Sequence, residues 1–343
     1  MTSPADVLYA DNPAWADVTP LPQYEGVNPL APILYTEEYK DATDYFRGIV
    51  KTGEKSPRVL ELTEKIIRLN PAHYSAWQYR FETLKAVKVP LEDELKLMDE
   101  LAVKYLKTYQ VWHHRRLLLT ESYNLEPKRE LEFIAKSLKA DTKNYHTWSY
   151  RQWLLAFVND GELWVGELDF VEEMLNEDLR NNSAWHHRFF VVWLGGGGGG
   201  MGVGGTREEK ERVLRRELTF TKQLISLAPN NPSAWNYLRG VLDRTETPYG
   251  LILPFVRLYI VNLSDRAGST DIVDVENPPP SEGAQLPCTA ALEFTADAYE
   301  RQGDDEGRKK AVELWKVLAN EQDTIRKRYW EFRIRGVEKK VGA

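Results

Sequence analysis

Three cations recur at one position of a repeating sequence pattern. Lys107, Lys143 and Arg180 each lie five residues before a tryptophan that opens the motif Trp-x-x-Arg. Each tryptophan segment starts with the residues of a helix N-terminus, where the first N–H groups are unpaired. A helix N-terminus beside a Lys or Arg is a ready site for an anion such as phosphate. The pattern alone leaves two interpretations open: three solvated surface cations on an acidic protein, or an anion site.

Two tyrosines add hydroxyl donors next to these cations. Tyr109 and Tyr145 each lie three residues before the tryptophan of their segment. If the segments form stacked helices, the helix N-termini line one rim and the tyrosines lie on it with the cations. The predicted site is therefore a row of cations and phenols rather than a single pocket.

The other reactive side chains form no catalytic or metal-binding motif. The histidines all lie in the repeated segments, at positions 73, 113, 114, 146, 186 and 187. Neighbouring histidines on a helix point in different directions and chelate poorly, so we expect no metal site in this chain. Cys288 has no nucleophile motif around it, and we expect a buried, inert thiol. The glycine-rich residues 195–205 contain G-x-G-x-x-G but lack the preceding strand and the Lys-Ser/Thr of a phosphate loop, which favours a flexible linker.

A repeat of about 36 residues must position these groups. The chain aligns without gaps through Trp77, Trp112, Trp148, Trp185 and Trp235, at spacings of 35, 36, 37 and 50 residues. A period in the mid-thirties is the length of one helix–turn–helix unit. The glycine-rich insertion at 195–205 accounts for the longest spacing.

Each period predicts two helices. Ser56-Pro57, Pro90 and Pro127 are typical of helix starts and precede apolar residues at helical spacing. The second helix, which carries Trp-x-x-Arg, follows a polar start at Asn70-Pro71, Lys143-Asn144, Asn181-Asn182 and Asn230-Asn231-Pro232. We expect the tryptophans to wedge between helices and the arginines to tie neighbouring repeats. Stacked pairs bury both faces, so the predicted fold is all-α, a right-handed, crescent-shaped α-α superhelix.

The domain organisation follows from where the repeat is interrupted. Residues 1–32 are rich in proline and predict an extended arm. Residues 33–338 predict a single α-solenoid, interrupted by the 195–205 insertion and by a proline-rich loop at 264–287. Residues 339–343 form a short tail.

Composition limits the class of protein. The chain has 343 residues and a net charge of −7, which disfavours a nucleic-acid-binding solenoid because such a protein needs a basic field. One cysteine excludes an internal disulfide framework and fits a reducing compartment. We find neither a secretory signal nor an apolar run long enough to span a membrane, and expect a cytoplasmic protein.

The Trp-x-x-Arg segments resemble the repeats of protein prenyltransferase α subunits. The stretches that carry the resemblance are Tyr109-Gln-Val-Trp-His-His-Arg-Arg116, Lys143-Asn-Tyr-His-Thr-Trp-Ser-Tyr-Arg-Gln-Trp153, Arg180-Asn-Asn-Ser-Ala-Trp185, Ser233-Ala-Trp-Asn-Tyr-Leu-Arg-Gly240 and Asp323-Thr-Ile-Arg-Lys-Arg-Tyr-Trp330. The similarity is to the family of α subunits shared by protein farnesyltransferase and geranylgeranyltransferase type I. The related Rab-type subunit often carries additional domains, for which this chain has no room.

The resemblance implies a partner and a reaction. In that family the α subunit wraps around a β subunit, which holds the catalytic zinc and most of the lipid pocket. The heterodimer moves a farnesyl or geranylgeranyl group from its diphosphate to the cysteine of a C-terminal CaaX protein. The zinc is then the β subunit's, and magnesium is expected for the farnesyl-transferring form.

The resemblance also assigns residues. Lys143 matches the family lysine that reaches the prenyl diphosphate, Tyr145 the tyrosine beside that site, and Tyr109 a tyrosine near the bound peptide. Asn144, His146 and Arg180 follow from their positions on the same rim. A tetratricopeptide-like scaffold without catalytic role remains the alternative, since its period is similar; its Trp-x-x-Leu-Gly-x-x-Tyr pattern is absent.

Overall fold

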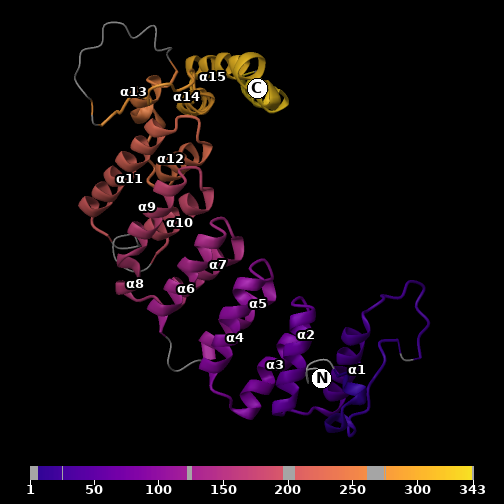
Figure 1. Ribbon diagram of the computed structural model, residues 1–343. Helices are drawn as coiled ribbons and strands as arrows, with labels where there is room; N and C mark the ends of the chain where they lie inside the picture. The colour runs from indigo at the N-terminus through magenta and orange to yellow at the C-terminus, as the bar shows by residue number, and fades with distance from the viewer. Residues whose placement is uncertain are drawn as a thin grey trace. The chain divides into compact units, whose positions relative to one another are not determined.

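The computed structural model describes residues 7–24, 26–121, 126–195, 205–260, 274 and 276–341. Across these ranges the regular structure is helical and contains no strand (Figure 1), which confirms the all-α prediction. The chain divides into two compact units, residues 1–153 and 154–343. The crescent shape of the whole chain and the single solenoid of residues 33–338 stay predictions.

The first unit is a stack of antiparallel helix pairs. Its helices are α1 (Glu37–Thr52), α2 (Pro57–Leu69), α3 (Tyr74–Val87), α4 (Leu91–Lys104), α5 (Tyr109–Glu121), α6 (Pro127–Ala140) and α7 (Tyr145–Val158), the last of which crosses the unit boundary. Within the stack α2 packs on α3 and α4 on α5, and α3 lies against α5. The second helices of successive pairs are therefore neighbours, as the repeat predicts.

The second unit repeats this plan and closes with a different arrangement. Its helices are α8 (Gly161–Val165), α9 (Glu167–Glu177), α10 (Asn182–Trp193), α11 (Arg207–Leu227), α12 (Pro232–Arg244), α13 (Leu253–Arg257), α14 (Thr289–Gln302), α15 (Asp305–Val317) and α16 (Lys327–Val341). The pairs α9–α10 and α11–α12 carry the motif, and α10 packs against α12. Trp315 and Trp330 lie in a buried cluster at the end of the chain.

The helix starts show which local predictions hold. Asn181 and Asn231 accept hydrogen bonds from first-turn N–H groups of α10 and α12, as expected. Asn70 instead ends α2, and His73 Nδ1 accepts the N–H of Ala76 at the start of α3. Ser56 is the N-cap of α2 and Pro57 its first residue, as expected, but the Ser56 hydroxyl donates to Glu54 and makes no capping hydrogen bond to the helix.

The repeated tryptophans are core residues that interlock the repeats. Each is at most 5% exposed. The ring of Trp77 contacts His114 at a centroid distance of 4.9 Å, and Trp185 contacts Tyr237 at 5.1 Å. In both cases the partner ring lies in the next repeat, two residues after that repeat's own tryptophan. The expectation that these tryptophans wedge between helices is confirmed.

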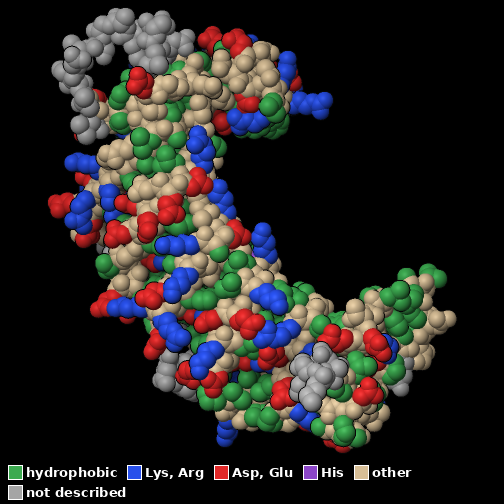
Figure 2. Space-filling model, in the orientation of Figure 1, with side chains coloured by type: hydrophobic (Ala, Val, Ile, Leu, Met, Phe, Trp, Pro, Cys, Tyr) green, Lys and Arg blue, Asp and Glu red, His purple; other side chains and the backbone are tan. Residues whose placement is uncertain are grey.

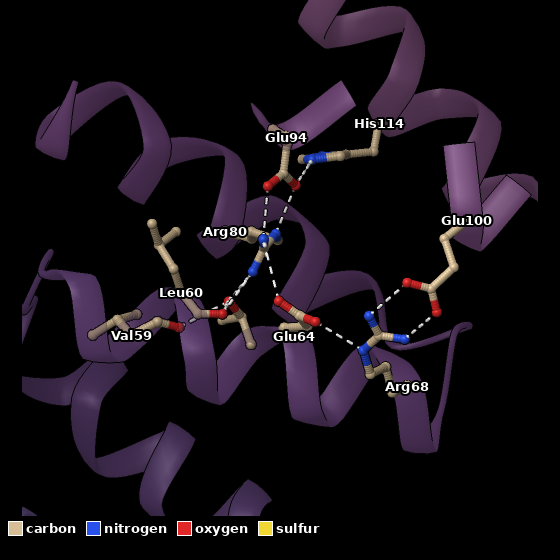
Figure 3. Close-up of polar contacts among 9 residues, drawn as sticks. Val59, Leu60, Glu64, Arg68, Arg80, Glu94, Glu100 and His114 are labelled. Atoms are coloured by element: carbon tan, nitrogen blue, oxygen red, sulfur yellow. Dashed lines mark hydrogen bonds and ion pairs between the residues drawn. The ribbon is translucent and has the colours of Figure 1, made fainter. Parts of the chain in front are cut away.

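Buried ion pairs join one repeat to the next. Arg80 of α3 forms a two-pronged pair with Glu94 of α4, at 2.7 and 2.6 Å, and Glu94 also meets His114 Nε2 at 2.9 Å (Figure 3). Arg115 forms the same pair with Glu130, and Arg188 with Glu217. The prediction that the motif arginines tie neighbouring repeats is confirmed.

We call the buried glutamates and the side chains that bind them the carboxylate ladder. The protonation states of these side chains suit the hydrogen bonds that they make. Burial alone would raise the pKa of Glu94, but hydrogen bonds from His114 and Arg80 lower it to about 2. Burial lowers the pKa of His114, which keeps the imidazole neutral and able to donate through Nε2. Burial also raises the pKa of Tyr150 and Tyr237, so these phenols stay protonated and donate to Glu130 and Glu217.

The N-terminal arm carries more structure than its prolines predict. Trp15 is 4% exposed and packs edge-on against Tyr45 of α1. Arg58 of α2 donates to both carboxylate oxygens of Asp17 and to the carbonyl of Ala14. Between residues 7 and 24 the arm is thus docked on the first helices. Most of the glycine-rich insertion (196–204) and much of the proline-rich loop (264–273 and 275) lie outside the described residues, as do the final two residues of the 339–343 tail.

Candidate functional site

The turn that leads into each tryptophan helix has one backbone geometry. The N–H four residues before the tryptophan donates to the carbonyl three residues earlier, at 2.9–3.1 Å, in all five repeats. The tryptophan indole N–H donates to the carbonyl six residues before it, at 2.7–2.9 Å. The residue between these two fixed points, five before the tryptophan, is the cation position. Its backbone is therefore held while its side chain points out of the turn.

Lys143 occupies this position in the turn between α6 and α7. Its side chain is exposed, and its N–H donates to Asp141 Oδ1 at 3.4 Å. The carbonyl of Thr142 accepts the indole N–H of Trp148 at 2.9 Å. Lys143 thus stands directly before the N-terminus of α7 on a backbone tied from both sides.

Asn144 is the residue that fastens this turn to the preceding repeat. It is 3% exposed, and its Oδ1 accepts the N–H of Thr147 at 3.1 Å, which caps α7. Its Nδ2 donates to the carbonyl of Leu106 at 3.2 Å and to Asp141 Oδ2 at 3.3 Å. The side-chain amide of Asn144 makes its hydrogen bonds within the protein. This geometry suits a residue that positions the turn rather than one that contacts a substrate.

A second cation reaches the same carboxylate. The Nζ of Lys107, in the corresponding turn one repeat earlier, lies 3.8 Å from Asp141 Oδ2. Asp141 therefore has the backbone of Lys143 on one side and the ammonium of Lys107 on the other. Two lysines therefore lie at the amino end of α7, and a helix end of this kind carries a partial positive charge that favours an anion.

Aromatic side chains lie beside this turn, as predicted. Tyr145 and Tyr109 are 76% and 56% exposed. The ring of His146 lies 5.6 Å from Tyr145 and 6.4 Å from Tyr109, centroid to centroid. The structure therefore brings Tyr109, Tyr145 and His146 together at the N-termini of α5 and α7.

A small cavity continues this aromatic row towards α3. Its volume is ≈ 170 Å³, and it is lined by Tyr74, Trp77, Gln78, Tyr109, Gln110, His113, His114 and Leu117. Tyr74, three residues before Trp77, is 69% exposed and repeats the position of Tyr109 and Tyr145. The row of exposed phenols thus begins one repeat earlier than the resemblance assigned.

Arg180 belongs to the second unit and is described there by itself. It is exposed, and its N–H donates to Asp178 Oδ1 at 2.8 Å, as the N–H of Lys143 does to Asp141. The next residue, Asn181, caps α10 through Oδ1. The cation position therefore has the same local geometry in both units.

Known proteins contain the same repeats as this structure. The family described as protein prenyltransferase alpha subunit repeat matches residues 56–87, 91–122, 127–158, 164–194 and 214–245. The protein farnesyltransferase/geranylgeranyltransferase type-1 subunit alpha of Dictyostelium discoideum is 33% identical over 332 residues, covering 95% of this chain and 93% of its own length. The chain belongs to the protein prenyltransferase α subunit family.

Two further relatives agree with this family. The subunit of the same name from Schizosaccharomyces pombe is 44% identical over 231 residues, covering 67% of this chain and 73% of its own. A solved structure, Candida albicans protein geranylgeranyltransferase-I complexed with GGPP, aligns with a TM-score of 0.76 and 30% identity over 94% of this chain and 98% of that one. The prenyltransferase repeats coincide with the helix pairs from α2–α3 to α11–α12. The tetratricopeptide-like alternative is set aside.

Sequence reasoning missed the carboxylate half of the ladder in these prenyltransferase repeats. Glu94, Glu130, Glu167 and Glu217 each lie eighteen residues before the tryptophan of their repeat. The spacing is regular in the sequence, but glutamate is common in helices, so the spacing alone does not distinguish these four residues from solvent-exposed ones. In the structure three of them accept hydrogen bonds from the motif arginine of the preceding repeat: Glu94, Glu130 and Glu217.

Other chemistry in the described part of the chain is sparse. Cys288 is fully buried, its thiol donates to the carbonyl of Pro229 at 3.0 Å, and burial raises its pKa, as expected for an inert thiol. Within the described ranges, no three His, Cys, Asp or Glu side chains gather in a group able to hold a metal ion. No helix of the described residues has the length and apolar character that a membrane crossing requires.

Proposed function

We propose that this chain is the α subunit shared by protein farnesyltransferase and protein geranylgeranyltransferase type I. The observation that carries the proposal is the match to relatives of that name over nearly the whole of both chains. With a β subunit it transfers a farnesyl or geranylgeranyl group from the diphosphate to the cysteine thiol of a C-terminal CaaX protein.

The chemistry divides between two subunits. Alkylating a thiol requires a thiolate, which a bound zinc ion can supply at neutral pH. We assign the zinc to the β subunit, because the histidines His114 and His187 are engaged by carboxylates of the ladder and Cys288 is buried. Magnesium accompanies the farnesyl-transferring form in this proposal. The cytoplasm is the proposed compartment, since a chain with one cysteine suits a reducing environment.

This chain's own contribution is charge at the leaving diphosphate. The diphosphate leaves more easily when a cation is already held at the place where its negative charge develops. Lys143 has the required exposure and a fixed backbone at the start of α7. In the proposal Tyr145 and His146 flank the diphosphate, and Tyr109 meets the peptide. Arg180 is proposed as a substrate-binding residue of the second unit.

Asn144 holds Lys143 in place rather than binding substrate. Asn144→Ala removes the cap on α7 and the tie to Leu106, and we expect turnover to fall on the order of tenfold because misplacing a catalytic group is costly. Asn144→Ser restores a capping oxygen but not the Nδ2 donor. The serine variant should regain the thermal midpoint without regaining turnover. Recovery of both together would show that Asn144 acts only through helix stability.

The test of the proposed function is assembly with a β subunit. A stable heterodimer buries a large, apolar interface that the lone chain leaves in water. We expect the isolated chain to aggregate, and to become soluble and active when produced with the β subunit of either enzyme. Transfer of labelled prenyl groups to a CaaX peptide is the measurement. A thermally robust lone chain that binds neither β subunit contradicts the proposal.

A further inference from the structure

The loop between the docked arm and α1 exposes aliphatic side chains to water. We call residues 26–35 the apolar loop; its sequence, Gly-Val-Asn-Pro-Leu-Ala-Pro-Ile-Leu-Tyr, contains no charged residue. Val27, Leu30, Ile33 and Leu34 are 65%, 106%, 61% and 90% exposed. In the space-filling view hydrophobic side chains gather on the loop that projects beyond α1 (Figure 2). Contiguous exposed apolar surface of this kind marks an interaction site.

The apolar loop is held in shape at both ends. Tyr24 accepts the N–H of Val27 through its carbonyl at 3.2 Å and the N–H of Ile33 through its hydroxyl at 2.9 Å. Gln23 donates to the hydroxyl of Tyr35 at 3.1 Å, and the ring of Tyr35 packs on Tyr39 of α1 at 4.8 Å.

The segment that precedes the loop is fastened to α1 as well. The N–H of Leu21 donates to the carbonyl of Asp44 at 3.0 Å, and Arg47 Nε donates to the carbonyl of Leu21 at 2.7 Å. Two prolines, Pro29 and Pro32, further limit the loop's backbone. A loop fixed in this way has already lost much of the freedom that binding would remove, which favours affinity.

The composition of the loop selects among possible partners. An anionic membrane surface is bound by apolar groups together with Lys or Arg, which the loop lacks. Transient interfaces are about as polar as the rest of a protein surface, whereas permanent ones are more hydrophobic. An uncharged, aliphatic, pre-shaped loop on a chain whose relatives are subunits therefore fits a permanent partner.

We propose that the apolar loop docks into an apolar groove on the β subunit and is a main anchor of the heterodimer. This rests on the proposed function. Because the same α chain would serve both enzymes, the groove is a feature that both β subunits share. The loop contributes to assembly, while Lys143 contributes to the reaction.

The experiment measures the dissociation of the labelled heterodimer on dilution, after this chain has been produced together with each β subunit in turn. Leu30→Ser/Leu34→Ser should raise the heterodimer Kd on the order of 100-fold or more, since two aliphatic side chains no longer leave water. Turnover at saturating β subunit should stay at the wild-type value. The matched control, Leu227→Ser/Leu251→Ser, changes two leucines that are 61% and 68% exposed in the second unit, and its Kd should stay near wild type.

The outcomes separate this proposal from the proposed function. If the wild-type chain binds neither β subunit, the proposed function fails and takes this inference with it. If the wild type assembles and the loop variant assembles equally well, or if the control weakens binding as much, the docking proposal alone is wrong. An unchanged Kd accompanied by lost self-association in sedimentation would assign the loop to a second copy of this chain and overturn the proposal. Because the changed side chains are exposed, the helical circular dichroism of each variant should match wild type.

Discussion

Replacing Lys143 with alanine should slow the prenyl-transfer step on the order of 10- to 150-fold. A charge-assisted hydrogen bond to the departing diphosphate contributes roughly 1.5–3 kcal/mol, and about 1.36 kcal/mol corresponds to tenfold in rate. Binding of the isoprenoid and the peptide should change less, because the contact tightens as the leaving group gains charge. The fold should survive, since the side chain is exposed and the turn is held by backbone and neighbouring groups. Single-turnover rates with saturating β subunit, zinc and both substrates are the measurement.

Three further variants make the Lys143 result specific. Lys136→Ala removes an exposed lysine from the preceding helix α6 and should leave the rate unchanged. Lys107→Ala removes the ammonium beside Asp141 and should have a small effect. Lys143→Arg keeps the positive charge but replaces the compact ammonium with a planar guanidinium. It should retain part of the wild-type rate that Lys143→Ala loses. Equal, small effects at Lys107 and Lys143 would reduce the cation row to surface charge.

The sequence predicted this fold well because its repeat is strict. A tryptophan every 35 to 37 residues sets the period through the first four repeats, and the helix pairs follow that period. Caps were predicted less well. Asn181 and Asn231 behaved as expected, but at the first repeat the cap passed from Asn70 to His73, because Asn70 ends the preceding helix. Several polar residues side by side can each satisfy the helix end, and only the path of the chain decides between them.

The candidate site was predictable by residue type but not by role. The spacing placed Lys143 and Asn144 together without showing that one is exposed and the other 3% exposed. That difference arises from the turn: Asn144 points inward and donates to the carbonyl of Leu106 in the preceding repeat and to Asp141 in its own turn. The apolar loop was hidden for a related reason. Its residues have the composition of a buried segment, and only their exposed fractions mark it as a surface.

Breaking one pair of the carboxylate ladder should cost the protein a large part of its stability. Glu217 is fully buried and accepts hydrogen bonds from Arg188 at 2.7 and 3.1 Å and from the hydroxyl of Tyr237 at 2.7 Å. Glu217→Ala leaves the fully buried guanidinium of Arg188 with the half-exposed carboxylate of Glu172 as its remaining ion-pair partner. Removing one member of a buried pair costs about 3–5 kcal/mol. For a unit of this size we expect the thermal midpoint to fall by roughly 6–20 °C.

The measurement is thermal unfolding of the heterodimer at fixed concentration, because assembly itself adds stability. Glu211→Ala, on the same helix α11, breaks an exposed pair with Arg207 and should leave the midpoint unchanged. The double change Arg188→Met/Glu217→Leu removes both charges, and its cost should be well below the sum of the two single changes. If Glu217→Ala shifts the midpoint no more than Glu211→Ala does, the buried pairs are not what joins the repeats. Because Arg188 and Glu217 lie in successive repeats, a large shift would instead show that the junctions between repeats carry the stability of the array, as a stacked solenoid requires.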